Sequence, residues 1–143
     1  MTTVFQTGIN NILNTRQSNS NIVHQFKMLT REGVEKGNKV VITSILPTDI
    51  GGPEVEQRVE EINAALGKVV EREGGIFIDM TKYFIENGRI ADELYRYERD
   101  GFLHLNAAGA SVMARKINQV IIEKGGSEII EDFWEQSLKY RRW

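Results

Sequence analysis

The sequence predicts an α/β domain in which a short parallel sheet lies between layers of helices. Short runs of β-branched and aromatic residues alternate with amphipathic helical patterns along the chain. The run KVVITSIL at residues 39–46 is apolar almost throughout, which is typical of a strand buried on both faces of a parallel sheet. The length of 143 residues matches one domain and is sufficient for a core.

The N-terminal part begins with a strand at residues 2–8, which is rich in β-branched and aromatic residues and ends at a glycine. The polar, turn-rich segment at residues 9–21 predicts a loop. Apolar residues then recur at helical spacing, so we expect a helix with Ser18 or Ser20 as its N-cap and an end near Gly37. The buried strand at residues 39–46 follows it.

The next helix is the clearest in the sequence, and Pro53 suits its first position. Its apolar stripe has spacings of three and four residues and consists of Val55, Val59, Ile62, Leu66 and Val69. A third strand is expected at residues 76–80, followed by a long irregular stretch. A further helix is expected at residues 108–123 and a last amphipathic helix at residues 127–143.

These elements predict a flavodoxin-like, three-layer α/β/α fold with about three parallel strands. We expect residues 1–125 to form this α/β domain and residues 126–143 to form a C-terminal amphipathic helix. In such sheets, functional residues gather at the carboxyl ends of the strands. The segments at residues 8–11 and 44–49, and the loop that leads to His104, are expected there.

The composition narrows the function classes. A formal charge of −2 gives no electrostatic reason to expect a nucleic-acid partner or an anionic membrane. The absence of cysteine excludes disulfides, thiolate catalysis and cysteine-based metal sites. His24 and His104 lie far apart in sequence, which argues against a histidine-rich metal site. We therefore expect no bound metal.

The sequence also argues against a membrane protein. Its apolar runs fall short of the ~18 residues that a membrane helix needs. The N-terminal sequence MTTVFQTG has neither the basic region nor the long apolar stretch of a signal peptide. We therefore expect no membrane span and a cytoplasmic location.

Asn10, in the sequence GINN after the first predicted strand, is a candidate oxyanion donor. An amide side chain at this place can donate to a developing negative charge, and Gly8 would let a substrate approach the backbone. The more common role of an asparagine in such a turn is a hydrogen bond between its side chain and the local backbone.

His104, in the sequence RDGFLHLNAAG, is a candidate general base. Such a base needs a neutral imidazole and a partner that fixes its tautomer, which is commonly a carboxylate. Asp100 is the obvious candidate for that partner. The alternative is a histidine near a helix start that simply packs between Phe102 and Leu105.

Taken together, four blocks resemble the SGNH (GDSL-like) hydrolase family in order and spacing: GINN, VVITSILP, IFIDM and DGFLHLNAAG. The resemblance implies a parallel sheet flanked by helices. It also implies hydrolysis of a small acyl ester through an acyl-serine, without a metal or organic cofactor. It further implies that Asn10, with Gly8 beside it, serves the oxyanion hole, that His104 is the base, and that Asp100 is its carboxylate.

The sequence departs from the family's pattern at three places. Asn11 stands where the family usually has an aspartate, and three residues separate Asp100 from His104 where the family usually has two. The Gly-Asp-Ser block that carries the nucleophile, and the block that carries an oxyanion glycine, are both absent from this sequence. We therefore expect a chain that is truncated relative to the SGNH hydrolase fold.

The serines of the chain offer a weak replacement for that nucleophile. Ser44 lies near the active edge of the sheet, although small polar residues at this place usually serve packing. Ser18 and Ser20 lie in a polar loop without the context of a nucleophile. The other serines fall on, or at the cap of, late helices: Ser111, Ser127 and Ser137.

Further side chains near that edge have simpler interpretations. We expect Asp79 to cap the turn that follows its strand. Tyr95 and Tyr97 either wall a substrate cleft or pack against the core. If the family pattern holds, Asn10 and His104 face one cleft at the carboxyl ends of the strands.

Two functions from different classes stay open. The first is an SGNH-type ester hydrolase represented by its C-terminal part, which would be inactive without a serine-bearing segment. The second is a catalytically inactive SGNH-like module used for binding or oligomeric assembly. Upstream coding sequence with a Gly-Asp-Ser motif in frame would favour the first. A nucleotide-binding domain is disfavoured because the sequence has no glycine-rich phosphate loop.

The strand at residues 2–8 also predicts a partner. In the SGNH-like sheet its neighbour is the strand with the serine, so Val4 and Phe5 would lie at an exposed edge with uncovered apolar surface. The strand has no lysine, proline or bulge to blunt this edge. We expect a homodimer, or a partner segment that completes the sheet, and the competing outcome is that residues 126–143 fold over the edge.

Overall fold

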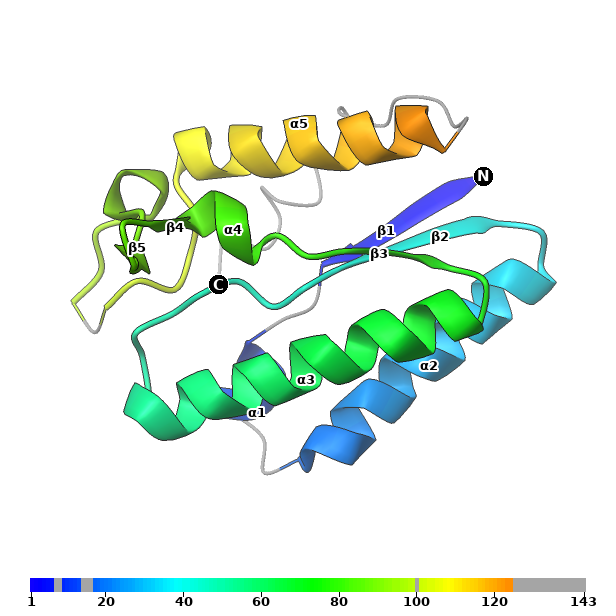
Figure 1. The fold of residues 1–143 in the computed structure, drawn as a ribbon, viewed down its shortest axis with the longest axis horizontal. Coiled ribbons are helices and arrows are strands. Elements are labelled where there is room, and N and C mark those ends of the chain that lie inside the picture. The colour runs from blue at the N-terminus through cyan, green and yellow to red at the C-terminus, as the bar shows by residue number, and fades with distance from the viewer. Residues whose placement is uncertain (7–8, 14–16, 100, 125–143) are drawn as a thin grey trace.

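The computed structural model describes residues 1–6, 9–13, 17–99 and 101–124. Figure 1 shows three layers, with the strands in the middle and helices on both sides. The three-layer α/β/α architecture with a short parallel sheet is therefore confirmed. The helix expected at residues 127–143 lies outside the described residues, as does the boundary between the two predicted regions.

The central sheet has three strands: β1 (Thr2–Gln6), β2 (Lys39–Thr43) and β3 (Ile76–Ile78). Their order is β1-β2-β3, and both pairs are parallel. Val41 lies at the centre, paired with Val4 on one side and Ile76 on the other. The apolar sequence of β2 thus marks the central strand, which has a neighbour on each side and helices over both faces.

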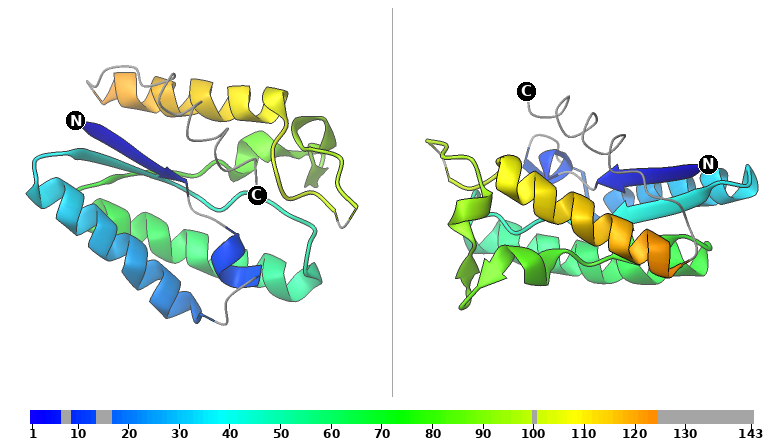
Figure 2. Two further views of the ribbon diagram at one scale, coloured as in Figure 1. Left: turned by 180° about the vertical axis from the view of Figure 1, so that it is seen from behind. Right: turned by 90° about the horizontal axis from the view of Figure 1, so that it is seen from above.

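The helices divide between the two faces of the sheet. Figures 1 and 2 show α2 (Asn19–Glu35) and α3 (Gly52–Arg72) on one face and α5 (Ala107–Glu123) on the other. Alternate residues of β2 supply the two halves of the core, because successive side chains point to opposite faces. Val40 and Ile42 belong to the half beneath α2 and α3, while Val41 belongs to the half beneath α5.

Side-chain caps begin two of these helices. Ser18 Oγ accepts a hydrogen bond of 3.1 Å from the backbone N–H of Asn21, so Ser18, one of the two expected residues, caps α2. Asn106 Oδ1 accepts a hydrogen bond of 2.9 Å from the N–H of Gly109 and caps α5. The Asn106 cap holds the N-terminus of α5 directly after the candidate base, His104.

Two segments expected to be irregular contain regular structure. The short helix α1 (Asn10–Leu13) lies in the segment expected to be a loop. The stretch after β3 contains α4 (Thr81–Phe84), a one-turn 3₁₀ helix, and a hairpin. The hairpin pairs β4 (Ile85–Glu86) with β5 (Arg89–Ile90). These elements carry the chain from the edge of the sheet to the loop that contains His104.

The edge at β1 differs in part from the expectation. Among the described residues, β1 is paired with β2 alone, so an edge is present. The expectation of uncovered apolar surface is wrong for Val4, which is 8% exposed and packs in the core half beneath α5. Phe5 is partly buried against the other half. The groups that β1 presents along this edge are therefore mainly backbone N–H and C=O groups.

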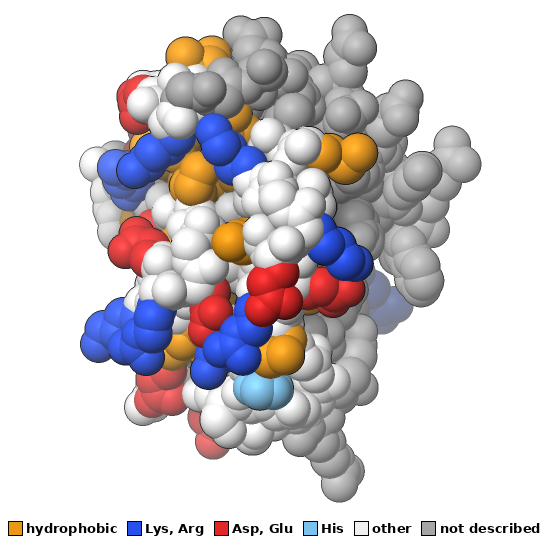
Figure 3. Space-filling model, turned by 90° about the vertical axis from the view of Figure 1, so that its right-hand side faces the viewer, with side chains coloured by type: hydrophobic (Ala, Val, Ile, Leu, Met, Phe, Trp, Pro, Cys, Tyr) orange, Lys and Arg blue, Asp and Glu red, His pale blue; other side chains and the backbone are white. Residues whose placement is uncertain are grey.

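The described part of the surface carries mixed charge. On the face in Figure 3, basic and acidic side chains are interspersed. Among the described residues, ion pairs join Arg31 to Glu73 at 2.7 Å and Lys36 to Glu32 at 2.9 Å. Within residues 1–124, as far as they are described, no helix is long and apolar enough to cross a membrane.

Candidate functional site around His104

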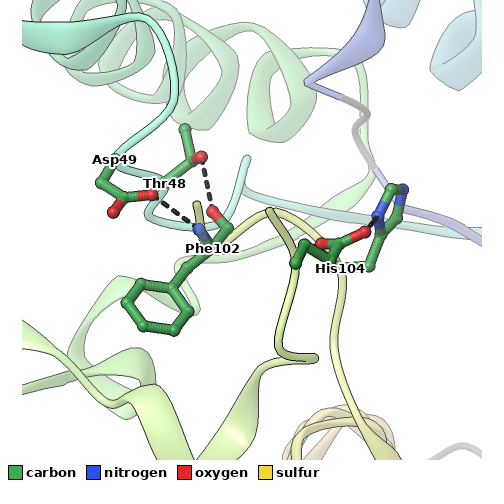
Figure 4. Close-up of polar contacts among 5 residues, drawn as sticks. Thr48, Asp49, Phe102 and His104 are labelled. Carbon is green, nitrogen blue, oxygen red and sulfur yellow. Dashed lines mark hydrogen bonds and ion pairs between the residues drawn. The ribbon is translucent and has the colours of Figure 1, made fainter. Parts of the chain in front are cut away.

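The loop that contains His104 is fastened to the loop that follows β2. The hydroxyl of Thr48 donates a 2.6 Å hydrogen bond to the backbone carbonyl of Phe102, and the N–H of Phe102 donates a 2.6 Å bond to Asp49 Oδ1 (Figure 4). The hydroxyl of Tyr95 donates a further 2.6 Å bond to the carbonyl of Pro47. These contacts hold the loop beyond the carboxyl end of β2, where parallel α/β sheets place their functional groups.

Gly101 makes this close approach possible. Its φ of +130° lies in a region that residues with a Cβ rarely adopt. A Cβ at this position would also collide with the carboxylate of Asp49. Glycine at position 101 therefore lets the backbone both turn and approach the Asp49 side chain that binds Phe102.

The backbone on either side of His104 is fixed as well. The N–H of Arg96 donates a 2.8 Å hydrogen bond to the carbonyl of His104, and Tyr95 forms an antiparallel bridge with Leu105. The side-chain amide of Asn106 donates to the carbonyls of Glu93 and Tyr95, at 2.7 and 3.0 Å. The candidate base thus lies on a short, well-braced segment that leads into α5.

Glu98 holds His104 through two hydrogen bonds. His104 Nδ1 lies 2.8 Å from Glu98 Oε1, and the N–H of His104 donates a 3.2 Å bond to Oε2 (Figure 4). Both side chains are partly buried, with 29% of His104 and 26% of Glu98 exposed. Desolvation raises the pKa of the Glu98 carboxyl, but the hydrogen bonds from His104 lower it, and the net pKa lies below its usual range.

Glu98 was not predicted as the carboxylate partner of His104. The expected partner, Asp100, lies outside the described residues, so its role stays a prediction. Glu98 precedes His104 by six positions, and this spacing matches no periodic pattern that would have indicated a contact between them. The contact depends on how the loop turns between the two residues, and Gly101 was the one visible sign of such a turn.

The structure places Asn10 at the same edge of the sheet as His104. Asn10 begins α1, beyond the carboxyl end of β1, and the loop of His104 is tied to the segment beyond the carboxyl end of β2. The side chain of Asn10 and the whole of Gly8 lie outside what the structure describes. A shared cleft and an oxyanion role for Asn10 and Gly8 therefore stay predictions.

Ser44 is placed as a packing residue. Its side chain is fully buried, and its hydroxyl accepts a 2.9 Å hydrogen bond from the N–H of Met80. The N–H of Ser44 in turn donates a 2.9 Å bond to the carbonyl of Ile78. A hydroxyl enclosed between β2 and the end of β3 cannot reach a bound ester, so Ser44 does not act as a nucleophile in this conformation.

The remaining predicted side chains have structural roles or are exposed. Asp79 Oδ1 accepts a 3.0 Å hydrogen bond from the N–H of Thr81 and so caps the turn before α4, as expected. Tyr95 packs edge-to-face against Phe84 and is 4% exposed, which confirms packing for this residue. Tyr97 is 99% exposed, so it does not pack.

Comparisons with known proteins agree with the fold but identify no sequence family. No protein-family model matches this sequence, and no curated protein matches it. Among solved structures, the chain is similar to the OSK domain of Drosophila Oskar, with a TM-score of 0.68. The match covers 82% of this chain and 60% of that chain, at 14% sequence identity.

The three-stranded parallel sheet flanked by helices resembles the SGNH-like fold of the OSK domain. This agrees with the family whose motif order the sequence resembles. At 14% identity the likeness establishes the fold alone, because one α/β fold supports many unrelated functions. This chain spans 60% of the length of the OSK chain that it matches, so function has to be argued from its own residues.

Proposed function

We propose that this chain is a non-catalytic SGNH-like module that assembles with a second copy of itself through the edge of β1. The observation that carries the proposal is the pairing of β1. Its five residues bond to β2 on one side, and the described part of the chain supplies no strand on the other. An unpaired strand edge is a template for a further strand.

The chemistry of β1 suits pairing better than that of the opposite edge. The sequence TTVFQ contains no lysine, proline or glycine, which are the residues that commonly blunt an edge. The opposite edge strand, β3, has only three residues, and short strands are poor templates. We therefore assign the interface to β1.

A second copy fits this edge because two β1 strands can pair antiparallel about a two-fold axis. With Val4 on that axis, Thr2 of one copy lies opposite Gln6 of the other, and every residue of the strand has a partner. Val4 and Phe5 keep their places in the core, since the new contacts are backbone hydrogen bonds. The result is a continuous six-stranded sheet across the dimer.

The non-catalytic part of the proposal rests on the serines. The hydroxyl of Ser44 is buried and bonded to Met80, and that of Ser18 caps α2. Neither hydroxyl is hydrogen-bonded to His104, whose Nδ1 is paired with Glu98. His104 therefore has no nucleophile in Ser18 or Ser44, and hydrolysis through an acyl-serine has no support from these two residues.

Charge placed on β1 tests the interface. Lysine at both Thr2 and Gln6 sets like charges opposite each other across the two-fold axis, and glutamate at both positions does the same. We expect the Thr2→Lys/Gln6→Lys and Thr2→Glu/Gln6→Glu chains to be monomers when each is alone. Mixed in equal amounts, the two chains should form a heterodimer, because every opposed pair then has opposite charge.

The matched control moves the same charges away from the edge. Glu60 is exposed on α3, and Glu60→Lys changes the net charge by +2, as the two lysines on β1 do, without touching β1. This control should dimerise like the parent chain. Sedimentation equilibrium measures all five samples: the parent chain, the control, each β1 variant alone and their mixture. Failure of the lysine and glutamate chains to associate when mixed would contradict the β1 interface. A monomeric parent chain would contradict pairing of β1 with a second copy.

A second candidate function is hydrolysis of a small acyl ester of the SGNH type. The observation that favours it is the pair formed by His104 and Glu98, which has the form of a base and its carboxylate. In that reading Asn10 and Gly8 serve the oxyanion, Asp100 is a further carboxylate near the base, and a partner segment supplies the serine. Fluorophosphonate labelling of this chain and of a longer version that carries a Gly-Asp-Ser segment tests it: a labelled serine in that segment, lost in the matching His104→Ala variant, would favour the hydrolase.

A further inference from the structure

The two hydrogen bonds between Glu98 and His104 carry an inference that does not depend on assembly at β1. A neutral imidazole has one nitrogen that donates and one that accepts. The hydrogen-bond partner of one ring nitrogen determines which of the two nitrogens carries the proton. The tautomer of His104 therefore follows from the chemistry of the atom beside Nδ1.

That atom is a carboxylate oxygen. Glu98 Oε1 lies 2.8 Å from Nδ1, and Oε2 is held by the backbone N–H of His104 at 3.2 Å. Because the net pKa of Glu98 lies below its usual range, the carboxyl is ionised at neutral pH and can only accept hydrogen bonds. Nδ1 must then donate, and the remaining lone pair of the ring lies on Nε2.

We propose that Glu98 is the positioning residue of His104 and holds its neutral ring as the Nδ1–H tautomer, with Nε2 free to accept a proton from a hydroxyl. The backbone contact makes the arrangement rigid: one carboxylate binds both the ring and the main chain of the same residue. A histidine side chain without such a partner prefers the opposite tautomer, with the proton on Nε2.

The proposal also makes a separate prediction for Asp100, which lies outside the described residues. Nδ1 has one proton to donate, and Glu98 already accepts it at 2.8 Å. We therefore expect Glu98, rather than Asp100, to set the tautomer of His104, although the family resemblance gives that role to Asp100. The tautomer of His104 should respond to substitution of the carboxylate that sets it, so variants of Glu98 and of Asp100 distinguish the two assignments.

Nitrogen NMR on the whole chain tests the proposal. With ¹⁵N-labelled histidine, long-range ¹H–¹⁵N spectra at pH 8, above the ordinary histidine pKa of about 6.5, distinguish a protonated from an unprotonated ring nitrogen. The chain has two histidines, and a His24→Gln variant assigns the signals, since His24 is exposed on α2. We expect His104 to be mainly Nδ1–H in the parent chain.

Two variants then separate the carboxylates. Glu98→Met keeps a side chain of similar length but removes the acceptor, and we expect the population ratio to reverse toward Nε2–H. Asp100→Asn should leave the ratio of the parent chain unchanged. Circular dichroism checks that both variants are folded, and the parent spectrum tests the proposal even if Glu98→Met is not.

Three results would overturn the assignment. They are an Nε2–H tautomer or a doubly protonated ring in the parent chain at pH 8, no change in a folded Glu98→Met variant, and a reversal caused by Asp100→Asn. The last result would restore Asp100 as the positioning carboxylate. A change in oligomeric state alone does not move this proton, and the circular dichroism check excludes unfolding as the cause of a reversal.

Discussion

The hydroxyl of Ser44 accepts a hydrogen bond of 2.9 Å from the backbone N–H of Met80, and both residues are fully buried. The bond joins the residue after β2 to the segment that leaves β3. Ser44 therefore strengthens the sheet at the edge where a hydrolase would need a free nucleophile. The first two predictions follow from this relationship.

The first prediction concerns ester hydrolysis. We expect the chain to hydrolyse p-nitrophenyl acetate no faster than its His104→Ala variant, because a base and an oxyanion donor without a positioned serine contribute little. Rates of p-nitrophenol release under identical conditions provide the measurement. A burst of product that disappears in the Ser44→Ala variant would show instead that Ser44 forms an acyl-enzyme.

The second prediction concerns stability. Ser44→Ala removes the acceptor of the Met80 N–H and leaves that buried group unsatisfied, so we expect the free energy of unfolding to fall by about 1–3 kcal/mol. Urea unfolding at neutral pH measures the change. Ser20→Ala removes an exposed hydroxyl from α2 and serves as the control, with an expected change within about 0.5 kcal/mol. Equal stabilities of the two variants would argue against the structural role of Ser44.

The third prediction concerns Gly101. Gly101→Ala should lower the free energy of unfolding by about 1–3 kcal/mol, because its φ of +130° disfavours a Cβ and the Asp49 carboxylate occupies the space. Gly37→Ala is the matched control, since Gly37 also has a positive φ, of +81°, but nothing near its Cβ position. Urea unfolding should show a larger loss for position 101. A smaller loss there would mean that Asp49 does not hold the loop as described.

The regular elements of this fold could be predicted because their patterns are local. β2 has an apolar sequence, and α3 buries Val59, Ile62 and Leu66 of its predicted stripe; the stripe was wrong at its end, where Val70 is buried and Val69 is only partly buried. Buried parallel strands that are joined by amphipathic helices can be arranged in few topologies, because parallel crossovers are almost always right-handed. The hairpin of β4 and β5 was missed although its signal was present. Asn87 and Gly88 form its turn, with φ of 54° and 75°.

The site was harder to predict because it depends on contacts between distant loops. The position of His104 is set by Thr48 and Asp49, which lie more than fifty residues earlier in the chain. No periodic pattern marks these side chains. The contact between Glu98 and His104 depends on one loop conformation, so sequence spacing alone favoured the carboxylate that the family motif names.

The fourth prediction concerns alkaline pH. Burial, and secondarily the negative charge of Asp49, raise the pKa of the Tyr95 phenol well above its ordinary value of about 10. In the unfolded chain the phenol ionises near that value, while in the folded chain it stays neutral. Its contribution to stability is therefore fully present below about pH 10 and is lost as pH rises further.

Tyr95→Phe tests this pH dependence. The variant loses the hydrogen bond to the Pro47 carbonyl, so it should be about 1 kcal/mol less stable at neutral pH. Above pH 10 it should lose stability less steeply than the parent chain, because it has no phenol to ionise. Tyr97→Phe, at a fully exposed position, is the control. Urea unfolding over the alkaline range gives the free energy of unfolding at each pH. Parallel curves of this free energy against pH for Tyr95→Phe and the parent chain would refute the prediction.

The mass of the unmodified chain in solution tests the central claim most directly. If two copies pair through Thr2–Gln6, sedimentation equilibrium at micromolar concentration should give a species of twice the chain mass of 16.3 kDa, in equilibrium with monomer on dilution. The lysine variant of β1 should shift that equilibrium to monomer. A single species of 16.3 kDa across the whole concentration range would contradict self-assembly through this edge.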